Sequence, residues 1–428
     1  MNGPVPRRGT APRTVVVGAG LAGLVSAILL RRHGHQVVLV AKGLGGLQLS
    51  QGTIDVLGRL DGRLVDDPWA AFDELPDSHP YRRIGVEAVR RGVDVLAGLL
   101  GPDLLAPVGE RNQLYPTAVG ALRPTLVVPP SMAAGAARDG RRIVIVGIDQ
   151  VKDFHPELVA GNLARTELPG GGRLQVRHAS IDLGARPGEV DSSPVVYARA
   201  LDQAHTREKF VRAVKAVAEP GEVIGLPAVL GVDDPLAWAD LQQRIGQPVF
   251  EIALQPPSVP GMRFNQALLA HTRRERVRTM LGAEVIGLVN EGSTVTGVRV
   301  QTAGGERTIG CDHVVHAPGG FESGALAVDS HNRVSETIFG LPVTATDATE
   351  LIHGDYWGAP QPLFEVGVRV DDQMRVLDDR GRAMYANLYA AGGILAGAIR
   401  WREKSGEGIA LGSAVKAVDA ITAGEDRP

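Results

Sequence analysis

The sequence predicts an α/β protein: a discontinuous domain built on a parallel sheet, with an α+β second domain inserted into it. Two observations predict this class. Residues 13–60 are typical of a strand, a glycine-rich turn, an apolar helix and a second strand, which together form a βαβ unit. One such unit cannot complete a parallel sheet, so we expect its remaining strands to come from residues 265–325 and 364–428.

The elements follow from local patterns, in chain order. The β-branched run 14–17 forms the first strand, Gly34 ends the helix after it, and residues 37–40 form the second strand. Prolines divide residues 61–110 into helical and looped pieces. We then expect strands at 141–147 and 175–181, and helices at 156–165, 193–217, 236–245 and 265–281. The last part should contain strands at 283–289, 313–317, 364–370 and 388–391, a hairpin at 294–309, a turn at 378–381 and a helix at about 408–421.

This order divides the chain into three parts. Residues 1–12, rich in proline and arginine, are expected to be a disordered leader. A cofactor-binding domain should combine residues 13–60, 265–325 and 364–428, and an inserted substrate or cap domain should combine residues 61–264 and 326–363. A cofactor would then lie at the carboxyl ends of the strands, where the two domains meet.

The composition excludes several classes of function. Hydrophobic residues make up 44% and charged residues 22% of the 428 residues, which is the balance of a globular protein. A net charge of −3 provides no basic excess to hold a nucleic acid. Cys311 is the single cysteine, so an internal disulfide, an iron–sulfur cluster and a structural zinc site are excluded. We therefore expect a cytoplasmic protein without a metal site.

No segment is expected to span or insert into a membrane. The strongest candidate, residues 14–30, contains glycines at 18, 20 and 23 and is followed at once by basic residues. A spanning helix needs about 20 continuous apolar residues. The arginines before this segment are also found in signal peptides, but the glycine spacing favours the functional turn described next.

The glycines of residues 18–23 carry the first functional signal. Their spacing, GxGxxG between a strand and a helix, is typical of Rossmann-type FAD- or NAD(P)-binding folds. The first glycine makes the tight turn, the second admits a pyrophosphate, and the third lets the helix pack on the strand. The helix N-terminus offers free N–H groups to the phosphates. The alternative is a packing turn that binds nothing.

The end of the second strand departs from this pattern. Dinucleotide-binding folds place an acidic residue there for the ribose hydroxyls, whereas this chain has Ala41 followed by Lys42. The departure disfavours a standard NAD site, and an adenosine ribose would need other partners. Lys42 either pairs with a phosphate or is a solvated charge at the strand end.

Four glycine-rich segments together indicate a flavin. They are the turn at 18–23, the loop at 45–53 with its hydroxyl groups, the strand and Gly-Gly turn at 313–321, and the stretch from 387 into the last helix. The N-terminus of that helix would face the pyrimidine edge of the ring, where negative charge collects on reduction. The residues expected to bind the cofactor are Gly18, Ala19, Gly20, Leu21, Ala22, Gly23, Ala41, Lys42, Gly45, Gly46, Ser50, Gln51, Gly52, Val285, Ala317, Pro318, Gly319, Gly392, Gly393, Gly408, Ile409 and Ala410.

This arrangement resembles the flavoproteins of the fumarate reductase and glutathione reductase superfamily, and more closely the family formed by the B subunit of anaerobic glycerol-3-phosphate dehydrogenases. The resemblance covers nearly the whole chain after residue 13. It is carried by residues 50–57, 120–125, 146–154, 338–343 and 359–362, and by the closing glycine-rich helix. Where the family has three glycines before that helix, this chain has Gly406-Glu407-Gly408.

The resemblance implies a reaction, a cofactor and partners. This chain would work with the catalytic flavin-bearing A subunit of the complex to oxidise glycerol 3-phosphate to dihydroxyacetone phosphate, and an iron–sulfur subunit would pass the electrons toward menaquinone. The family cofactor is FMN, whereas the diphosphate turn favours FAD. The complex would place this chain at the inner face of the cell membrane through its partners. Separately, Ile399 and Trp401 flank Arg400 in the loop 394–401, and an exposed apolar patch there would mark the partner contact. The alternative is that Trp401 packs internally.

The oxidation of an alcohol needs a base for the hydroxyl proton and, for this substrate, cations for the phosphate. No spacing identifies the base, so the catalytic residues stay unassigned. The candidate bases are His316, His331 and His353, and the candidate anion binders are Arg123, Arg400, Arg402 and Lys404. Each also has an ordinary structural interpretation, a core position for His316 and solvated surface positions for the others.

Three functions stay open at this point. The chain could oxidise glycerol 3-phosphate at its own flavin, or act as an electron-transfer or scaffold subunit whose flavin never meets the substrate. It could also be a stand-alone flavin oxidoreductase with another substrate, because a fold does not assign chemistry.

Overall fold

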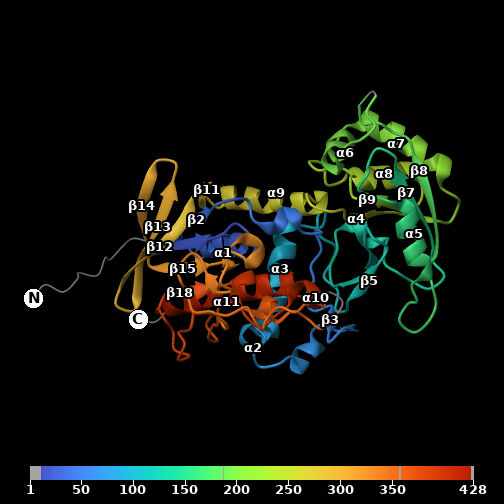
Figure 1. Cartoon of the computed structure of the whole chain (residues 1–428). Coiled ribbons are helices and arrows are strands. Elements are labelled where there is room, and N and C mark those ends of the chain that lie inside the picture. Colours follow the sequence, from blue (N-terminus) through green and yellow to red (C-terminus); the bar gives the residue numbers. More distant parts are fainter. Residues whose placement is uncertain (1–10, 187, 356–357, 426–428) are drawn as a thin grey trace, which may run out of the picture.

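The computed structural model describes residues 11–186, 188–355 and 358–425 (Figure 1). The expected leader, residues 1–12, lies outside the described residues except for Ala11 and Pro12. The chain forms two lobes. The larger lobe contains both ends of the described chain, and the smaller one, drawn in green at the upper right of Figure 1, comes from the middle of the sequence.

A five-stranded parallel sheet forms the centre of the larger lobe. Its order is β11-β2-β1-β15-β18. The first and last thirds of the sequence are therefore joined in one sheet, as the opening βαβ unit predicts. The backbone of β1 and β15 is buried on both faces, which explains their continuous runs of valine. The strands are β1 (Arg13–Val17), β2 (Gln36–Ala41), β11 (Arg278–Leu281), β15 (His313–His316) and β18 (Leu388–Ala390).

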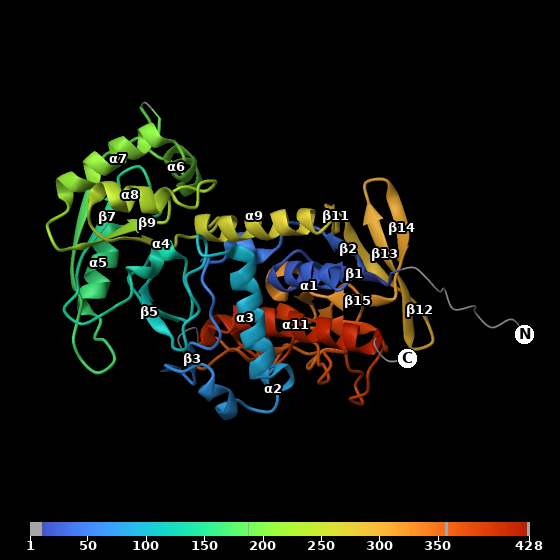
Figure 2. The same cartoon turned by 180° about the vertical axis from the view of Figure 1, so that it is seen from behind.

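Helices pack against this sheet. In Figure 2, α3 crosses α11, and α11 lies beside α1. The crossing of α3 and α11 is close because it is made at small residues: a Cβ added to Gly92 would lie 2.8 Å from the carbonyl carbon of Leu411. The helices are α1 (Leu21–Arg32), α2 (Tyr81–Ile84), α3 (Val86–Leu100), α9 (Val259–Arg274), α10 (Arg400–Glu403) and α11 (Gly406–Glu425).

Antiparallel strands decorate the larger lobe. A meander of three strands stands at the end farthest from the smaller lobe (Figure 1). It consists of β12 (Glu284–Glu291), β13 (Thr294–Thr302) and β14 (Gly305–Gly310), so it contains the hairpin expected at 294–309. The shorter pairs are β3 (Arg59–Leu60) with β4 (Arg63–Leu64), and β16 (Leu326–Val328) with β17 (Val334–Glu336). A further pair, β5 (Gln113–Pro116) with β6 (Leu122–Thr125), lies beside the smaller lobe (Figure 1).

The smaller lobe has a parallel sheet of its own, in the order β10-β9-β7-β8. Helices alternate with its strands, so this lobe is more regular than the α+β organisation that we expected. Its strands are β7 (Arg142–Ile148), β8 (Gln175–Ile181), β9 (Val223–Pro227) and β10 (Val249–Ile252). Its helices are α4 (Pro130–Ala133), α5 (Pro156–Arg165), α6 (Pro194–Leu201), α7 (Ala204–Val217) and α8 (Ala237–Ile245).

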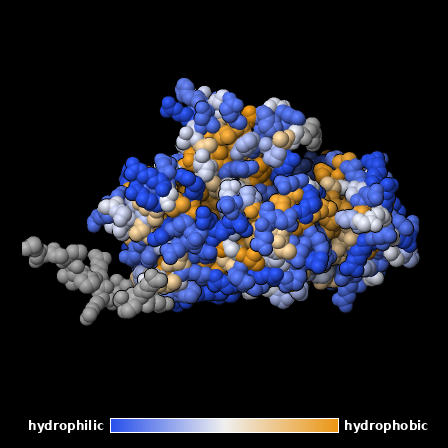
Figure 3. Space-filling view, turned by 90° about the horizontal axis from the view of Figure 1, so that it is seen from below, coloured by the Kyte–Doolittle hydropathy of each residue, from blue (hydrophilic) through white to orange (hydrophobic). Residues whose placement is uncertain are grey.

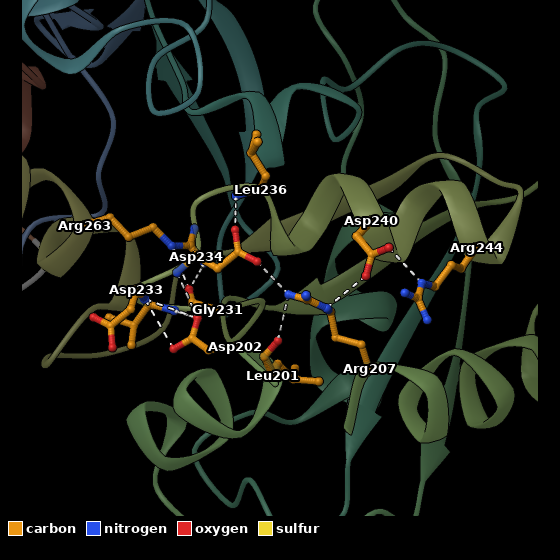
Figure 4. Close-up of polar contacts among 11 residues, drawn as sticks. Leu201, Asp202, Arg207, Gly231, Asp233, Asp234, Leu236, Asp240, Arg244 and Arg263 are labelled. Carbon is orange, nitrogen blue, oxygen red and sulfur yellow. Dashed lines mark hydrogen bonds and ion pairs between the residues drawn. The ribbon is translucent and has the colours of Figure 1, made fainter. Parts of the chain in front are cut away.

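A buried arginine joins the two lobes. Arg263 of α9 donates from Nε to the carbonyl oxygen of Gly231 at 2.8 Å, and it pairs with the buried Glu251 at the end of β10. Figure 4 shows Arg263 beside Gly231 and Asp202. Asp202 accepts hydrogen bonds from the backbone of Val232 and from the two residues after it, which fixes the loop that Arg263 holds.

Three expectations differ from the structure. The helix predicted at 265–281 ends at Arg274, and Arg278–Leu281 is instead the edge strand of the main sheet, because its pairing with β2 outweighs the local pattern. Residues 364–370 form no strand: a 3₁₀ helix, η4 (Pro362–Glu365), is followed by single bridges. The helix predicted at 193–217 is divided into α6 and α7.

The packing of residues 69–105 also differs from the expected division. We placed them in the inserted domain, but they bury apolar side chains in the same core as β1 and α11. The part that forms a separate core extends from β7 to β10. The remaining 3₁₀ helices are η1 (Gly46–Leu49), η2 (Ala70–Glu74), η3 (Phe321–Ser323) and η5 (Gly392–Ile394).

Candidate functional site

The three glycines of the turn between β1 and α1 occupy three different environments. A Cβ added to Gly18 would collide with the carbonyl oxygen of Ala317, and one added to Gly23 would collide with the carbonyl oxygen of Gly18. A Cβ added to Gly20 would meet no atom within 4 Å in the part of the chain that the structure describes. The first and third glycines therefore allow close packing, whereas the second leaves the backbone accessible from outside.

The N-terminus of α1 is prepared for an anion. Its first turn contains no acidic residue, and its N-cap residue, Gly20, provides no side-chain cap. The first N–H groups of a helix have no partner within the helix. Together with the helix dipole they attract phosphate groups.

The loop after β2 covers this turn. Gly45 has φ of 76°, and a Cβ there would lie 2.5 Å from the carbonyl oxygen of Ala19. Gly46 faces open space, and η1 is held from behind by α9 at Gly261. Farther along, the hydroxyl of Ser50 accepts a hydrogen bond from the amide of Gly52 at 3.3 Å. The segment predicted to contact a diphosphate therefore lies directly beside the glycine turn.

Two further predicted segments meet at the same place. Ala317, Pro318 and Gly319 follow β15, and a Cβ on Gly18 would lie 3.1 Å from the Cα of Pro318. Gly392 and Gly393 follow β18, and a Cβ on Gly392 would lie 3.0 Å from the Cβ of Ala22. The structure thus brings the glycine turn, the loop after β2 and the ends of β15 and β18 together around the start of α1.

At the start of α11 we expected Gly408 and Ile409 to face the cofactor, and the structure places them differently. Gly408 is packed against Tyr81, and its amide donates to the carbonyl oxygen of Asp55 at 3.0 Å. Ile409 is buried, and its amide donates to the carbonyl oxygen of Ser405. These two residues therefore face the protein core, while Gly406 and Glu407 face an open cavity.

That cavity has a volume of about 650 Å³ and lies at the carboxyl ends of β15 and β18. Three cationic side chains come into it from two segments, β6 and residues 400–404, and two carboxylates also line it. Phe364 and Trp401 form an exposed edge-to-face pair at its wall, with ring centroids 6.2 Å apart. The lining residues are Arg123, Gly320, Phe321, Glu322, Leu326, Phe364, Val366, Gly393, Ala398, Arg400, Trp401, Lys404, Gly406 and Glu407.

Charges in this cavity shift each other's protonation. Burial and the negative charge of Asp55 together raise the pKa of Glu407 to about 7, although Arg123 opposes both. Burial and the nearby Arg123 lower the pKa of Lys404. Glu407 therefore changes its protonation close to neutral pH, whereas Asp55 is held beside the guanidinium of Arg123.

Two of the three cationic side chains that line the cavity are paired with carboxylates of the protein. Arg400 donates to Glu322 at 2.9 Å and also to the carbonyl oxygen of Gly393. Arg123 is paired with Asp55. Lys404 donates to the carbonyl oxygen of Trp401 at 2.5 Å, and within the described residues it forms no ion pair. Arg402, the fourth predicted anion binder, does not line the cavity.

The three candidate histidines lie outside the cavity. His316 is fully buried, and its Nε2 lies 3.1 Å from Oε1 of Glu336. Burial raises the pKa of Glu336, but hydrogen bonds from His316 and from two backbone amides outweigh it and lower that pKa overall. His331 and His353 are exposed. The core position considered for His316 is the one that the structure shows.

Sequence reasoning missed Asp55 and Tyr81, and it treated Glu407 only as a departure from a family pattern. Asp55 is buried, and its Oδ1 has no hydrogen-bond partner among the described residues. The only sequence signal for it was its place in the family-like stretch 50–57. A buried carboxylate in a loop gives no periodic pattern from which it could be found.

The geometry defines a class of protein. A glycine turn with an open second position, an uncapped helix N-terminus and a covering loop fit the diphosphate of a dinucleotide. A large cavity at the carboxyl ends of the neighbouring strands fits a ring and a small substrate. These features define a flavoprotein with a dinucleotide-type cofactor site.

Comparison with known proteins specifies the family. Residues 13–409 match the family model of the FAD binding domain. The probable B subunit of an anaerobic glycerol-3-phosphate dehydrogenase from Halobacterium salinarum is 33% identical over 93% of this chain and 94% of its own length. The corresponding protein of Pectobacterium atrosepticum is 30% identical over 95% of this chain and 97% of its own length. The chain belongs to the FAD-binding family that contains these subunits, and it is a flavin-dependent oxidoreductase with FAD as its cofactor.

More distant solved structures also align with this chain. A 3-ketosteroid Δ1-dehydrogenase from Sterolibacterium denitrificans aligns over 97% of this chain and 100% of its own, with a TM-score of 0.46 and 12% identity.

Within the described part of the chain, no helix is long and apolar enough to cross a membrane. The same residues contain no group of three or more His, Cys, Asp or Glu side chains that could hold a metal ion.

Proposed function

We propose that this chain is a flavin-bearing subunit of a quinone-linked glycerol-3-phosphate dehydrogenase, and that it oxidises glycerol 3-phosphate to dihydroxyacetone phosphate at its own cavity. The observation that carries the proposal is the cavity of about 650 Å³ at the carboxyl ends of β15 and β18. It contains a carboxylate of raised pKa and a cation that forms no ion pair among the described residues. The names of the related subunits support the substrate.

Lys404 is the group that we assign to the substrate phosphate. A phosphate needs cations that are not neutralised by carboxylates of the protein, and Arg123 and Arg400 each have such a partner. Burial lowers the pKa of Lys404, and a phosphate dianion beside the ammonium group would raise that pKa again because it favours the charged form. Arg123 also lines the cavity and contributes positive electrostatic potential there, although it is paired with Asp55.

Glu407 is the group that we assign to the hydroxyl proton. A general base works best when its pKa lies close to the operating pH, and the pKa of Glu407 is raised to about 7. In the oxidation, the O–H proton would pass to the carboxylate of Glu407 while the hydrogen on the same carbon leaves as a hydride. FAD supplies the hydride acceptor when bound.

Electrons must then leave the chain through partners. Cys311 cannot hold an iron–sulfur cluster alone. We therefore propose two partners, a separate catalytic flavin subunit with an iron–sulfur subunit, and through them a position at the inner face of the cell membrane with menaquinone as acceptor. The face in Figure 3 shows separate apolar patches among hydrophilic residues. Trp401, which is 59% exposed, marks the surface that we assign to a partner.

A second function has one observation in its favour. Two of the three cations at the cavity are already paired within the chain. This would suit an electron-transfer subunit whose flavin does not meet the substrate. The two functions differ in whether the isolated chain turns over.

The test is the formation of dihydroxyacetone phosphate by the purified, FAD-loaded chain with an artificial electron acceptor. We expect product from glycerol 3-phosphate and none from glycerol, since glycerol lacks the phosphate that Lys404 would bind. Absence of product, in a preparation whose FAD is still reduced by dithionite, would contradict the proposal and favour the electron-transfer function.

A further inference from the structure

We propose that Glu284, the first residue of β12, supplies the carboxylate that binds the ribose hydroxyls of the adenosine of FAD. It would replace the acidic residue that is absent from the end of β2. The inference concerns the cofactor site alone and does not depend on the identity of the substrate.

The path of the chain places Glu284 at the missing position. Strand β11 pairs in parallel with β2, and Leu281 lies opposite Ala41. The chain then turns at Gly282, which has φ of 73°, and the amide of Ala283 donates to the carbonyl oxygen of Ala41 at 3.3 Å. The next residue is Glu284, so its backbone begins beside the end of β2.

The side chain of Glu284 is directed to that strand end. Its Oε1 lies 3.1 Å from Nζ of Lys42, the residue that follows Ala41. The side chains of Glu284 and Lys42 are 53% and 80% exposed. Within the described residues, Oε2 of Glu284 has no hydrogen-bond partner, so one carboxylate oxygen remains available to a ligand.

The surrounding sequence offers no competing carboxylate. Residues 33–54, which include β2 and the loop over the glycine turn, contain no aspartate or glutamate, and neither do residues 276–283. Within these two segments and the residue that follows the second, Glu284 is therefore the one acidic residue. Stability does not explain its pairing with Lys42, because an exposed pair of this kind contributes only about 0–1 kcal/mol.

This position is continuous with the diphosphate site. The amide of Gly18 donates to the carbonyl oxygen of Val40 at 2.8 Å, so the end of β2 adjoins the glycine turn. A dinucleotide that places its phosphates at the start of α1 extends its adenosine toward the end of β2. Lys42 would orient the Glu284 carboxylate, and Val285, which we predicted as a cofactor residue, is the next residue of the strand.

The proposal predicts selective loss of FAD. FMN carries the same ring and one phosphate but no adenosine, so only FAD would use Glu284. The full chain is freed of flavin and titrated with FAD and with FMN, and binding is followed by the quenching of flavin fluorescence. For Glu284→Gln we expect about a tenfold weaker affinity for FAD, and no change in the affinity for FMN.

Two further variants make the result decisive. Glu291→Gln changes an exposed carboxylate at the other end of the same strand, and it should alter neither affinity. The double variant A41E/E284Q places a carboxylate at the usual strand-end position and should recover FAD binding. An unchanged FAD affinity in Glu284→Gln, or an equal loss for FAD and FMN, would overturn the proposal.

Discussion

Arg123 Nε lies 2.7 Å from Oδ2 of Asp55, and this buried ion pair connects β6 to the segment beneath the start of α11. The backbone carbonyl of Asp55 also accepts the amide of Gly408. Arg123 neutralises the charge of Asp55 in part, and the remainder acts on Glu407. Glu407 therefore retains its proton to a higher pH than an ordinary glutamate does.

The first prediction concerns stability and pH. The pKa of Glu407 is raised to about 7 in the folded chain, above its ordinary value of 4.5. An acid with a raised folded pKa holds its proton more tightly in the folded state, so its contribution to stability is full below about pH 4.5 and is lost as the pH rises to 7. Glu407→Gln should therefore gain up to about 3 kcal/mol in the free energy of unfolding relative to the wild type between pH 5 and pH 8. Denaturant unfolding of both proteins at pH 5 and at pH 8 measures this gain. An equal gain at the two pH values would contradict the raised pKa of Glu407.

The second prediction concerns the diphosphate turn. A Cβ added to Gly20 would meet no atom of the described residues within 4 Å, and the φ of −77° there suits any residue. Gly20→Val should therefore fold with the melting temperature of the flavin-free wild type, yet bind no FAD, because its side chain occupies the path of the phosphates. Gly98→Val, on the exposed face of α3, is the matched control and should bind FAD normally. FAD binding by the Gly20 variant would place the phosphates elsewhere.

How much of this could be predicted from the sequence depends on the type of interaction. The glycine turn and helix α5 follow from local patterns, and the structure shows both where we expected them. Residues 278–281 form a strand because of pairing with β2, and α3 joins the larger lobe because of its contact with α11; neither has a local signal. The pairing of Lys42 with Glu284 joins residues far apart in the chain, so no spacing indicates it.

The third prediction concerns the substrate phosphate. Lys404→Met removes the cavity cation that has no ion pair among the described residues while keeping a flexible side chain of similar length. The KM for glycerol 3-phosphate should rise about tenfold or more, and the FAD content should stay normal. Lys209→Met, on the exposed face of α7 in the smaller lobe, should leave the KM unchanged. An unaltered KM in the Lys404 variant would show that another group binds the phosphate.

The fourth prediction separates structure from catalysis at His316. Its side chain is fully buried against Glu336, so His316→Gln weakens a buried charged hydrogen bond and should cost about 1–3 kcal/mol of folding stability. Turnover per bound FAD should be preserved, since His316 lies outside the cavity. Comparing melting temperature with turnover checks this. Lost turnover at unchanged stability would make His316 a candidate base again.

The fifth prediction concerns the partner surface. Trp401 is 59% exposed beside Phe364, at the wall of the cavity. Changing Trp401 and Arg402 together to alanine should lower quinone-linked turnover in the assembled complex, while the FAD content of the chain stays normal. If quinone-linked turnover also survives, the contact lies on another surface.

The most direct test of the account is anaerobic reduction of the isolated, FAD-loaded chain by glycerol 3-phosphate, followed in the flavin absorbance. We predict that one equivalent of substrate bleaches the flavin fully with no partner protein present, and that Glu407→Gln slows this bleaching while still binding FAD. A flavin that stays oxidised with glycerol 3-phosphate but is bleached by dithionite would contradict the claim that substrate is oxidised at this chain's own cavity.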